Sequence, residues 1–86
     1  MTGVIVYRLE FCPNCELLKA YLNERGAEYA EEDMSSAAAL TELRVNGVFA
    51  SEAPVLRKGE TFLTSAELFA GGAVNRAAVD SLLAGT

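Results

Sequence analysis

The chain has 86 residues, 51% of them hydrophobic, and a formal net charge of −5 at pH 7. Its hydrophobic content argues against disorder, and its acidic balance argues against a nucleic-acid surface and against binding to an anionic membrane. Its length fits one domain, residues 1–86, and no apolar run approaches the roughly 20 residues that span a bilayer. Residues 1–3 do not begin a signal-peptide pattern, so we expect a cytoplasmic protein.

The first expected elements are a buried strand and an amphipathic helix. Four consecutive apolar residues within 4–9 predict a strand that is buried on both faces. A helix is expected over about 13–25, with an apolar side that includes Leu18 and Leu22 and that Leu17 widens; Gly26 predicts its end. The glutamates of a second strand, over 27–32, predict an exposed edge of the sheet.

The second half of the chain predicts two more strands and three helices. In chain order they are a helix over 37–45, a loop over 47–53, strands over 53–56 and 61–63, and helices over about 65–70 and 74–84. Ser35 or Ser36 can cap the first of these helices, and Thr64 with Glu67 predicts a capping box at the next. Gly71-Gly72 is expected to separate the last two helices. The order is β-α-β-α-β-β-α plus a terminal helix.

The only two cysteines, Cys12 and Cys15, lie where the first strand turns into the first helix, which is a redox signal in a βαβ pattern. Pro13 fits the first helical position, because its missing N–H would have no partner there. Cys12 then caps the helix and Cys15 lies one turn in, so the two sulfurs can form a disulfide. The unpaired N–H groups of the helix favour a thiolate at Cys12. We therefore predict that Cys12 attacks disulfides and that Cys15 resolves the mixed disulfide.

The Cys12-Pro13-Asn14-Cys15 turn and the order of elements resemble the thioredoxin-fold redoxins, and glutaredoxins in particular, over nearly the whole chain. The resemblance implies an α/β thioredoxin fold of the glutaredoxin form, with a four-stranded mixed sheet flanked by helices. It also implies a thiol–disulfide oxidoreductase that takes part in electron transport and reduces protein disulfides. No bound cofactor is expected, since the reducing equivalents come from glutathione or a thioredoxin reductase. We expect a monomer.

The resemblance also places a cis-proline opposite the active-site turn, and Pro54 matches it by position. A cis Ala53–Pro54 bond would leave the backbone of Ala53 able to pair with an incoming chain beside Cys12, much as a strand adds to a sheet edge. Phe11 is expected either to pack beside the turn or to form an apolar rim for partner docking.

Two features by which glutaredoxins bind glutathione are absent. Leu9 stands where they carry a basic residue, and residues 64–67 stand where they carry Gly-Gly and an acidic residue. The remaining candidates for binding a carboxylate are Arg8, Arg57 and the helix start at Thr64 and Ser65.

The triplet from Ala53 to Val55 is similar to that of NrdH-redoxins, the glutaredoxin-like electron donors to ribonucleotide reductase that are reduced by thioredoxin reductase. Their usual active-site turn lacks the proline found here at position 13, so the match is partial. The expected function is a general or reductase-dedicated dithiol redoxin with weak or no use of glutathione.

Two other interpretations stay open. Two thiolates can supply half of a zinc site, or bridge a [2Fe–2S] cluster between two chains with added thiols. The chain has no histidine, so such a metal site would need a second chain or an outside ligand. Alternatively, the chain is an interaction domain in which the cysteine pair has no catalytic role.

Overall fold

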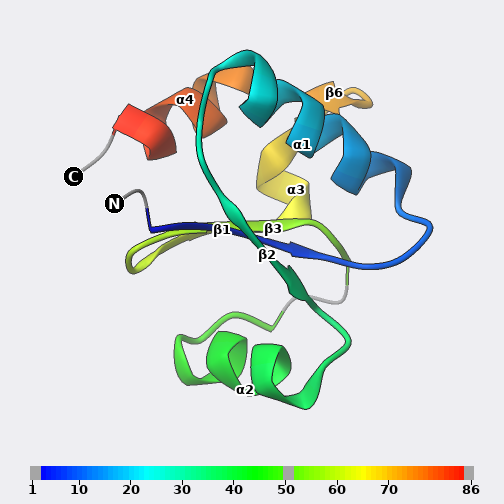
Figure 1. Cartoon of the computed structure of the whole chain (residues 1–86), viewed down its shortest axis with the longest axis vertical. Coiled ribbons are helices and arrows are strands. Elements are labelled where there is room, and N and C mark those ends of the chain that lie inside the picture. The colour runs from blue at the N-terminus through cyan, green and yellow to red at the C-terminus, as the bar shows by residue number, and fades with distance from the viewer. Residues whose placement is uncertain (1–2, 50–51, 85–86) are drawn as a thin grey trace.

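Four strands form one mixed sheet at the centre of the molecule (Figure 1). The structure is a computed structural model that describes residues 3–49 and 52–84. In spatial order, the strands are β2 (Ala30–Asp33), β1 (Val4–Arg8), β3 (Val55–Lys58) and β4 (Thr61–Leu63). β1 runs parallel to β2 and antiparallel to β3, and β3 is antiparallel to β4. The predicted four-stranded mixed sheet is confirmed.

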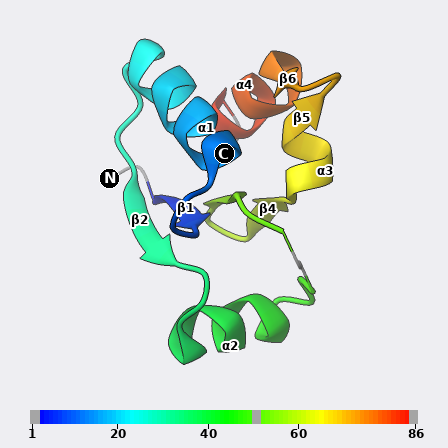
Figure 2. The ribbon, with the colours of Figure 1, turned by 90° about the vertical axis from the view of Figure 1, so that its right-hand side faces the viewer.

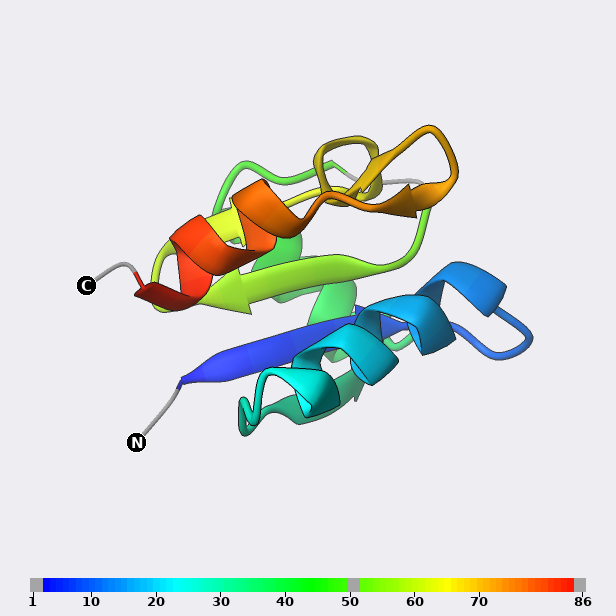
Figure 3. The ribbon, with the colours of Figure 1, turned by 90° about the horizontal axis from the view of Figure 1, so that it is seen from above.

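Helices cover both faces of this sheet, as predicted (Figure 2). The helices are α1 (Pro13–Glu24), α2 (Ala37–Val45), α3 (Ser65–Leu68) and α4 (Arg76–Ala84). α1, α3 and α4 lie on one face, and α2 alone covers the other. Figure 3 shows the molecule from the side of α1 and α4, with β1 and β3 beneath them. Within residues 3–49 and 52–84, no helix is long and apolar enough to cross a membrane.

β1 is buried on both faces because successive side chains of a strand point to opposite sides of the sheet. Val4 and Val6 belong to the larger core, and Tyr7 belongs to the smaller core under α2. The larger core contains Val4, Val6, Leu18, Tyr21, Leu22, Leu56, Leu68, Val79 and Leu82. The smaller core contains Tyr7, Met34, Ala39, Leu43 and Val55. The prediction of a strand buried on both faces is confirmed.

α1 ends where the sequence predicts. Gly26 has a φ of 68°, a left-handed conformation that glycine adopts without a Cβ clash. The N–H of Ala27 then donates to the carbonyl of Leu22 at 3.0 Å, which satisfies one of the last helical carbonyls. The prediction that Leu17 widens the apolar side is wrong. Leu17 is 46% exposed, because the helical rotation of one residue turns it away from the face on which Leu18 is buried.

β2 is an exposed edge strand, as its glutamates predict. It begins at Ala30 rather than at 27, because pairing with β1 starts only where Ile5 lies opposite Ala30. Glu31 forms ion pairs with Arg8 at 2.8 Å and with Lys19 at 3.3 Å. Part of the acidic edge is therefore paired within the chain.

The chain after α3 differs from the prediction. The helix expected over 65–70 ends at Leu68, and β5 (Phe69–Ala70) pairs with β6 (Ala73–Val74) as a small hairpin (Figure 2). Gly71 and Gly72 form its turn, with φ of 60° and 81°, and a two-residue turn of this hand needs positive φ at both positions. The two glycines therefore lie between α3 and α4, as predicted, but they separate the two helices by turning a hairpin that was not predicted. α4 begins at Arg76 rather than at 74, and the Asn75 side chain accepts a hydrogen bond from the N–H of Ala78.

The other predicted elements hold with small shifts. α2 spans the predicted residues, and the hydroxyl of Ser36 caps it by accepting a hydrogen bond from Ala39 N–H at 3.1 Å. β4 matches its prediction, whereas β3 starts at Val55 because Pro54 has no N–H to give to the ladder. Of the loop predicted over 47–53, residues 50–51 lie outside the described residues.

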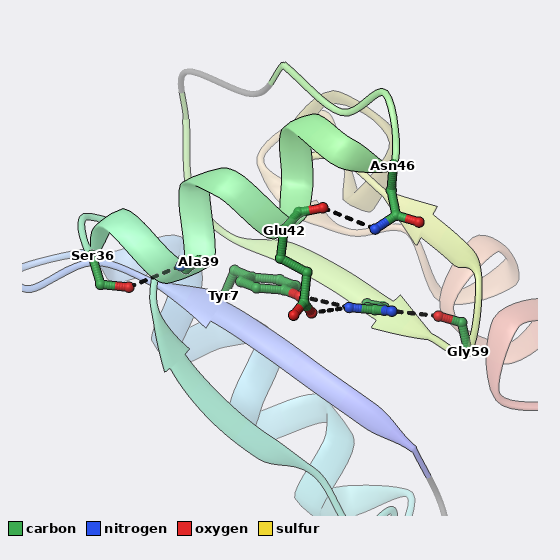
Figure 4. A network of polar contacts seen from close by, with 7 residues as sticks. Tyr7, Ser36, Ala39, Glu42, Asn46 and Gly59 are labelled. Atoms are coloured by element: carbon green, nitrogen blue, oxygen red, sulfur yellow. Dashed lines mark hydrogen bonds and ion pairs between the residues drawn. The ribbon is translucent and has the colours of Figure 1, made fainter.

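A polar network ties α2 to the sheet (Figure 4). Tyr7 donates its hydroxyl hydrogen to Glu42 at 2.9 Å and accepts a hydrogen bond from Arg57 at 3.1 Å. Arg57 also forms an ion pair with Glu42, donates to the carbonyl of Gly59 at 2.7 Å, and lies over the Phe62 ring. Burial raises the pKa of Tyr7, and the hydrogen bond from Arg57 opposes that rise.

The two leucines of α1 give a matched test of the core. Leu22→Ala should lower the free energy of unfolding by about 2–5 kcal/mol, because Leu22 is fully buried and its removal leaves a cavity. Leu17→Ala, the same change at an exposed position of the same helix, should cost less than about 1 kcal/mol. Urea unfolding followed by circular dichroism measures both, and equal losses would contradict this packing.

The raised pKa of Tyr7 predicts a loss of stability at alkaline pH. The folded protein holds this phenolic proton to higher pH than the unfolded chain, so the free energy of unfolding falls as pH rises above about 10. Tyr7→Phe should make this fall shallower. Urea unfolding at about pH 9 and about pH 11 measures the difference. Tyr29→Phe is the control, because no hydrogen bond of its hydroxyl occurs among the described residues. If Tyr7→Phe leaves the fall of the free energy of unfolding with pH unchanged, Tyr7 is not its source.

Candidate active site

Cys12 and Cys15 are joined by a disulfide at the start of α1, with their Cα atoms 5.2 Å apart. Cys12 is the N-cap residue, with extended backbone angles of φ −113° and ψ 98°, and Pro13 opens the helix. The N–H of Cys15 donates to the sulfur of Cys12 at 3.0 Å. This N–H is one of those that the helix itself cannot satisfy. The predicted positions of the cap, the proline and the sulfur pair are confirmed.

The two sulfurs differ in their access to solvent. Cys12 is half-buried, whereas Cys15 is only 1% exposed. An incoming thiol or thiolate can therefore approach Cys12, and the body of the protein shields Cys15. This difference supports the predicted division of roles, in which Cys12 exchanges with the substrate and Cys15 resolves the mixed disulfide.

The start of β3 lies beside the disulfide. The Ala53–Pro54 peptide bond is cis, as predicted, and the ring of Pro54 is buried. The carbonyl oxygen of Ala53 lies 3.9 Å from the sulfur of Cys12, although the two residues are 41 positions apart. The pairing of Tyr7 with Val55 explains this approach, because it brings the end of β1 and the beginning of β3 to the same edge. A polar backbone group is therefore available beside the accessible sulfur.

Phe11 precedes Cys12 and projects into solvent. Its residue surface is 98% exposed and its φ is 55°, which is unusual for a bulky residue. Of the two placements considered from the sequence, packing beside the turn is wrong, because an outward-pointing ring has no neighbour to pack on. Phe11 instead forms an apolar projection next to the disulfide.

The two arginines considered for substrate binding are engaged elsewhere. Arg8 lies at the end of β1 and pairs with Glu31 of β2. Arg57 lies in the network with Tyr7 and Glu42 on the α2 face, opposite Ile5 in the sheet and therefore away from the end at which β1 meets the disulfide. The structure does not bring Arg57 together with Cys12.

The start of α3 is capped by the carboxylate of Glu67. Glu67 accepts hydrogen bonds from the N–H of Thr64 at 3.0 Å and from its hydroxyl at 3.1 Å. Ser65 follows as the first residue of a four-residue helix. The capping-box pattern of the sequence predicted this contact. The sequence interpretation did not include what this contact means for a ligand: Glu67 already accepts the N–H of Thr64, which a bound carboxylate would otherwise use.

A metal site is not assembled within the described part of the chain. No group of three or more His, Cys, Asp or Glu residues there is placed to hold a metal ion. The metal-binding alternative, which calls on a second chain or an outside ligand, stays a prediction.

No protein-family model matches the sequence, and no curated protein matches it either. Among solved structures, a glutaredoxin from Archaeoglobus fulgidus is similar, with a TM-score of 0.68 and 18% sequence identity. The match covers 99% of this chain and 89% of the archaeal chain. Such a likeness establishes the fold. The chain has the thioredoxin-like α/β fold in its glutaredoxin form, and it carries a C-x-x-C disulfide at the start of its first helix.

Proposed function

We propose that this protein is a small dithiol redoxin that catalyses thiol–disulfide exchange. The observation that carries the proposal is an accessible sulfur at a helix N-terminus, bonded to a buried sulfur one turn away. In the reduced protein, the Cys12 thiolate attacks one sulfur of a protein disulfide, forms a mixed disulfide and releases one thiolate. The Cys15 thiolate then attacks the Cys12 sulfur, restores the internal disulfide and releases the second thiolate. Two electrons pass from the dithiol to the substrate.

A flavoprotein of the thioredoxin reductase class is the better source of these electrons than glutathione. Glutathione carries carboxylates, and the groups considered for holding them are already occupied. Arg8 is paired with Glu31, Arg57 with Glu42, and the N–H of Thr64 with Glu67. A cysteine pair of this kind also suits a reducing compartment, so the proposal includes a cytoplasmic location, protein disulfide substrates and action as a monomer.

Two serine substitutions test the mechanism. Cys12→Ser should reduce turnover of a protein disulfide such as insulin to background, because the attacking thiolate is lost. Cys15→Ser should instead accumulate mixed disulfides, because the resolving thiol is lost. Non-reducing gels and mass spectrometry measure the trapped species. Turnover by Cys15→Ser at the wild-type rate would rule out this mechanism, and activity retained by Cys12→Ser would rule out its nucleophile.

A parallel assay with two reductants tests the electron source. Insulin reduction should proceed with thioredoxin reductase and NADPH, and should be at least about tenfold slower with glutathione and its reductase, because the carboxylate-binding groups are occupied. NADPH consumption measures both rates, and a known glutaredoxin serves as the positive control for the glutathione system. A faster rate with glutathione would contradict this preference while leaving the exchange chemistry intact.

A further inference from the structure

The accessible sulfur of Cys12 has an aromatic ring directly beside it in the sequence. Phe11 is 98% exposed and holds a positive φ of 55°, so its ring contributes no burial to the core. An exposed ring on an unfavourable backbone does not favour folding, and such outliers are concentrated at functional sites. Aromatic side chains, phenylalanine among them, are also enriched in the cores of protein interfaces. Phe11 therefore has the properties of a contact residue for a partner.

Two exposed glutamates are sequence neighbours of this ring and of the backbone beside the sulfur. Glu10 lies two residues before Cys12, and Glu52 precedes Ala53, whose carbonyl lies 3.9 Å from the Cys12 sulfur. Neither carboxylate forms an ion pair with any residue that the structure describes.

The cations of the neighbouring elements do not offset these charges. Arg8 and Lys19 are both paired with Glu31, and Lys19 is also paired with Glu16. Arg57 is paired with Glu42 on the α2 face. The edge of the sheet at which Cys12 is exposed therefore presents net negative charge to an approaching molecule.

We propose that Phe11, Glu10 and Glu52 form a docking surface for a protein whose disulfide is flanked by basic side chains and lies beside an apolar pocket. This rests on the proposed function, because the docked disulfide is the one that Cys12 attacks. The ring of Phe11 enters the apolar pocket, and the two carboxylates attract the basic rim. The same carboxylates repel anionic disulfides, including the oxidised form of glutathione.

The charge selection is tested with the reduced full chain and three small disulfides: cystamine, which is a dication, hydroxyethyl disulfide, which is neutral, and dithiodipropionate, which is a dianion. Single-turnover rates are measured at about 10 mM and about 1 M salt, where the Debye length is about 30 Å and about 3 Å. At low salt, Glu10→Gln combined with Glu52→Gln should lower the cystamine-to-dithiodipropionate rate ratio by about fivefold or more. High salt should lower the wild-type ratio in the same way.

Glu28→Gln is the matched control, because Glu28 is exposed and lies between α1 and β2, at the other end of β1 from the disulfide. Its rate ratio should equal that of the wild type. A ratio that the double variant or high salt leaves unchanged would overturn the charge selection. Reduction of hydroxyethyl disulfide would then still support the exchange chemistry, whereas failure to reduce any of the three disulfides would overturn the proposed function as well.

The anchoring role of Phe11 is tested with Phe11→Gly, which accepts the positive φ and should keep or raise the melting temperature. The probe is a synthetic peptide disulfide with lysine and leucine residues around its cysteines. Phe11→Gly should raise KM for this peptide several-fold, whereas Phe11→Tyr, which keeps an aromatic ring, should have the KM of the wild type. Val45→Ala, at another solvent-exposed apolar residue, on α2, should leave KM unchanged. An unchanged KM in Phe11→Gly would overturn the anchor.

Discussion

The pairing of β1 with β3 is the constraint on which the rest of the structure depends. β1 is buried between two helical layers, and its antiparallel register with β3 sets Tyr7 opposite Val55. Beyond that pair, β1 continues into the turn that carries Cys12, and β3 is preceded by Ala53 and Pro54. A disulfide and a backbone carbonyl that are distant in sequence therefore meet at one sheet edge. A slip of one residue in this register would turn every side chain of β1 to the wrong core.

The same arrangement places polar backbone groups around the sulfur of Cys12. The N–H of Cys15 already donates to the Cys12 sulfur, and the N-terminal end of α1 adds the partial positive charge of the helix. Both interactions favour negative charge on that sulfur. The surrounding carboxylates act over a longer range and are more strongly screened by salt. In the proposed mechanism, the backbone therefore favours the thiolate of Cys12, and the proposed role of Glu10 and Glu52 is to select which molecules approach it.

Local sequence patterns predicted most of the fold and the centre of the site. The apolar run of β1, the cap and proline of α1, and Gly26 depend on neighbouring residues, so they are visible in the sequence. The β5–β6 hairpin was missed because Gly71-Gly72 also fits a break between two helices; cross-strand pairing of Phe69 with Val74 decided between the two. The engagement of Arg57 was also missed, because its partner Glu42 lies on a different element and is 15 residues away.

The excess of acidic over basic residues is the physical basis of the proposed preference for a reductase over glutathione. The chain has 12 acidic and 7 basic residues, so its own carboxylates outnumber the cations that a ligand would need. An intramolecular carboxylate competes at an effective concentration in the millimolar range or above. Each exposed pair is worth only about 0–1 kcal/mol, so displacing one costs a ligand up to about fivefold in affinity. Glu31, Glu42 and Glu67 occupy three separate candidate sites, and the combined cost exceeds that of any one of them.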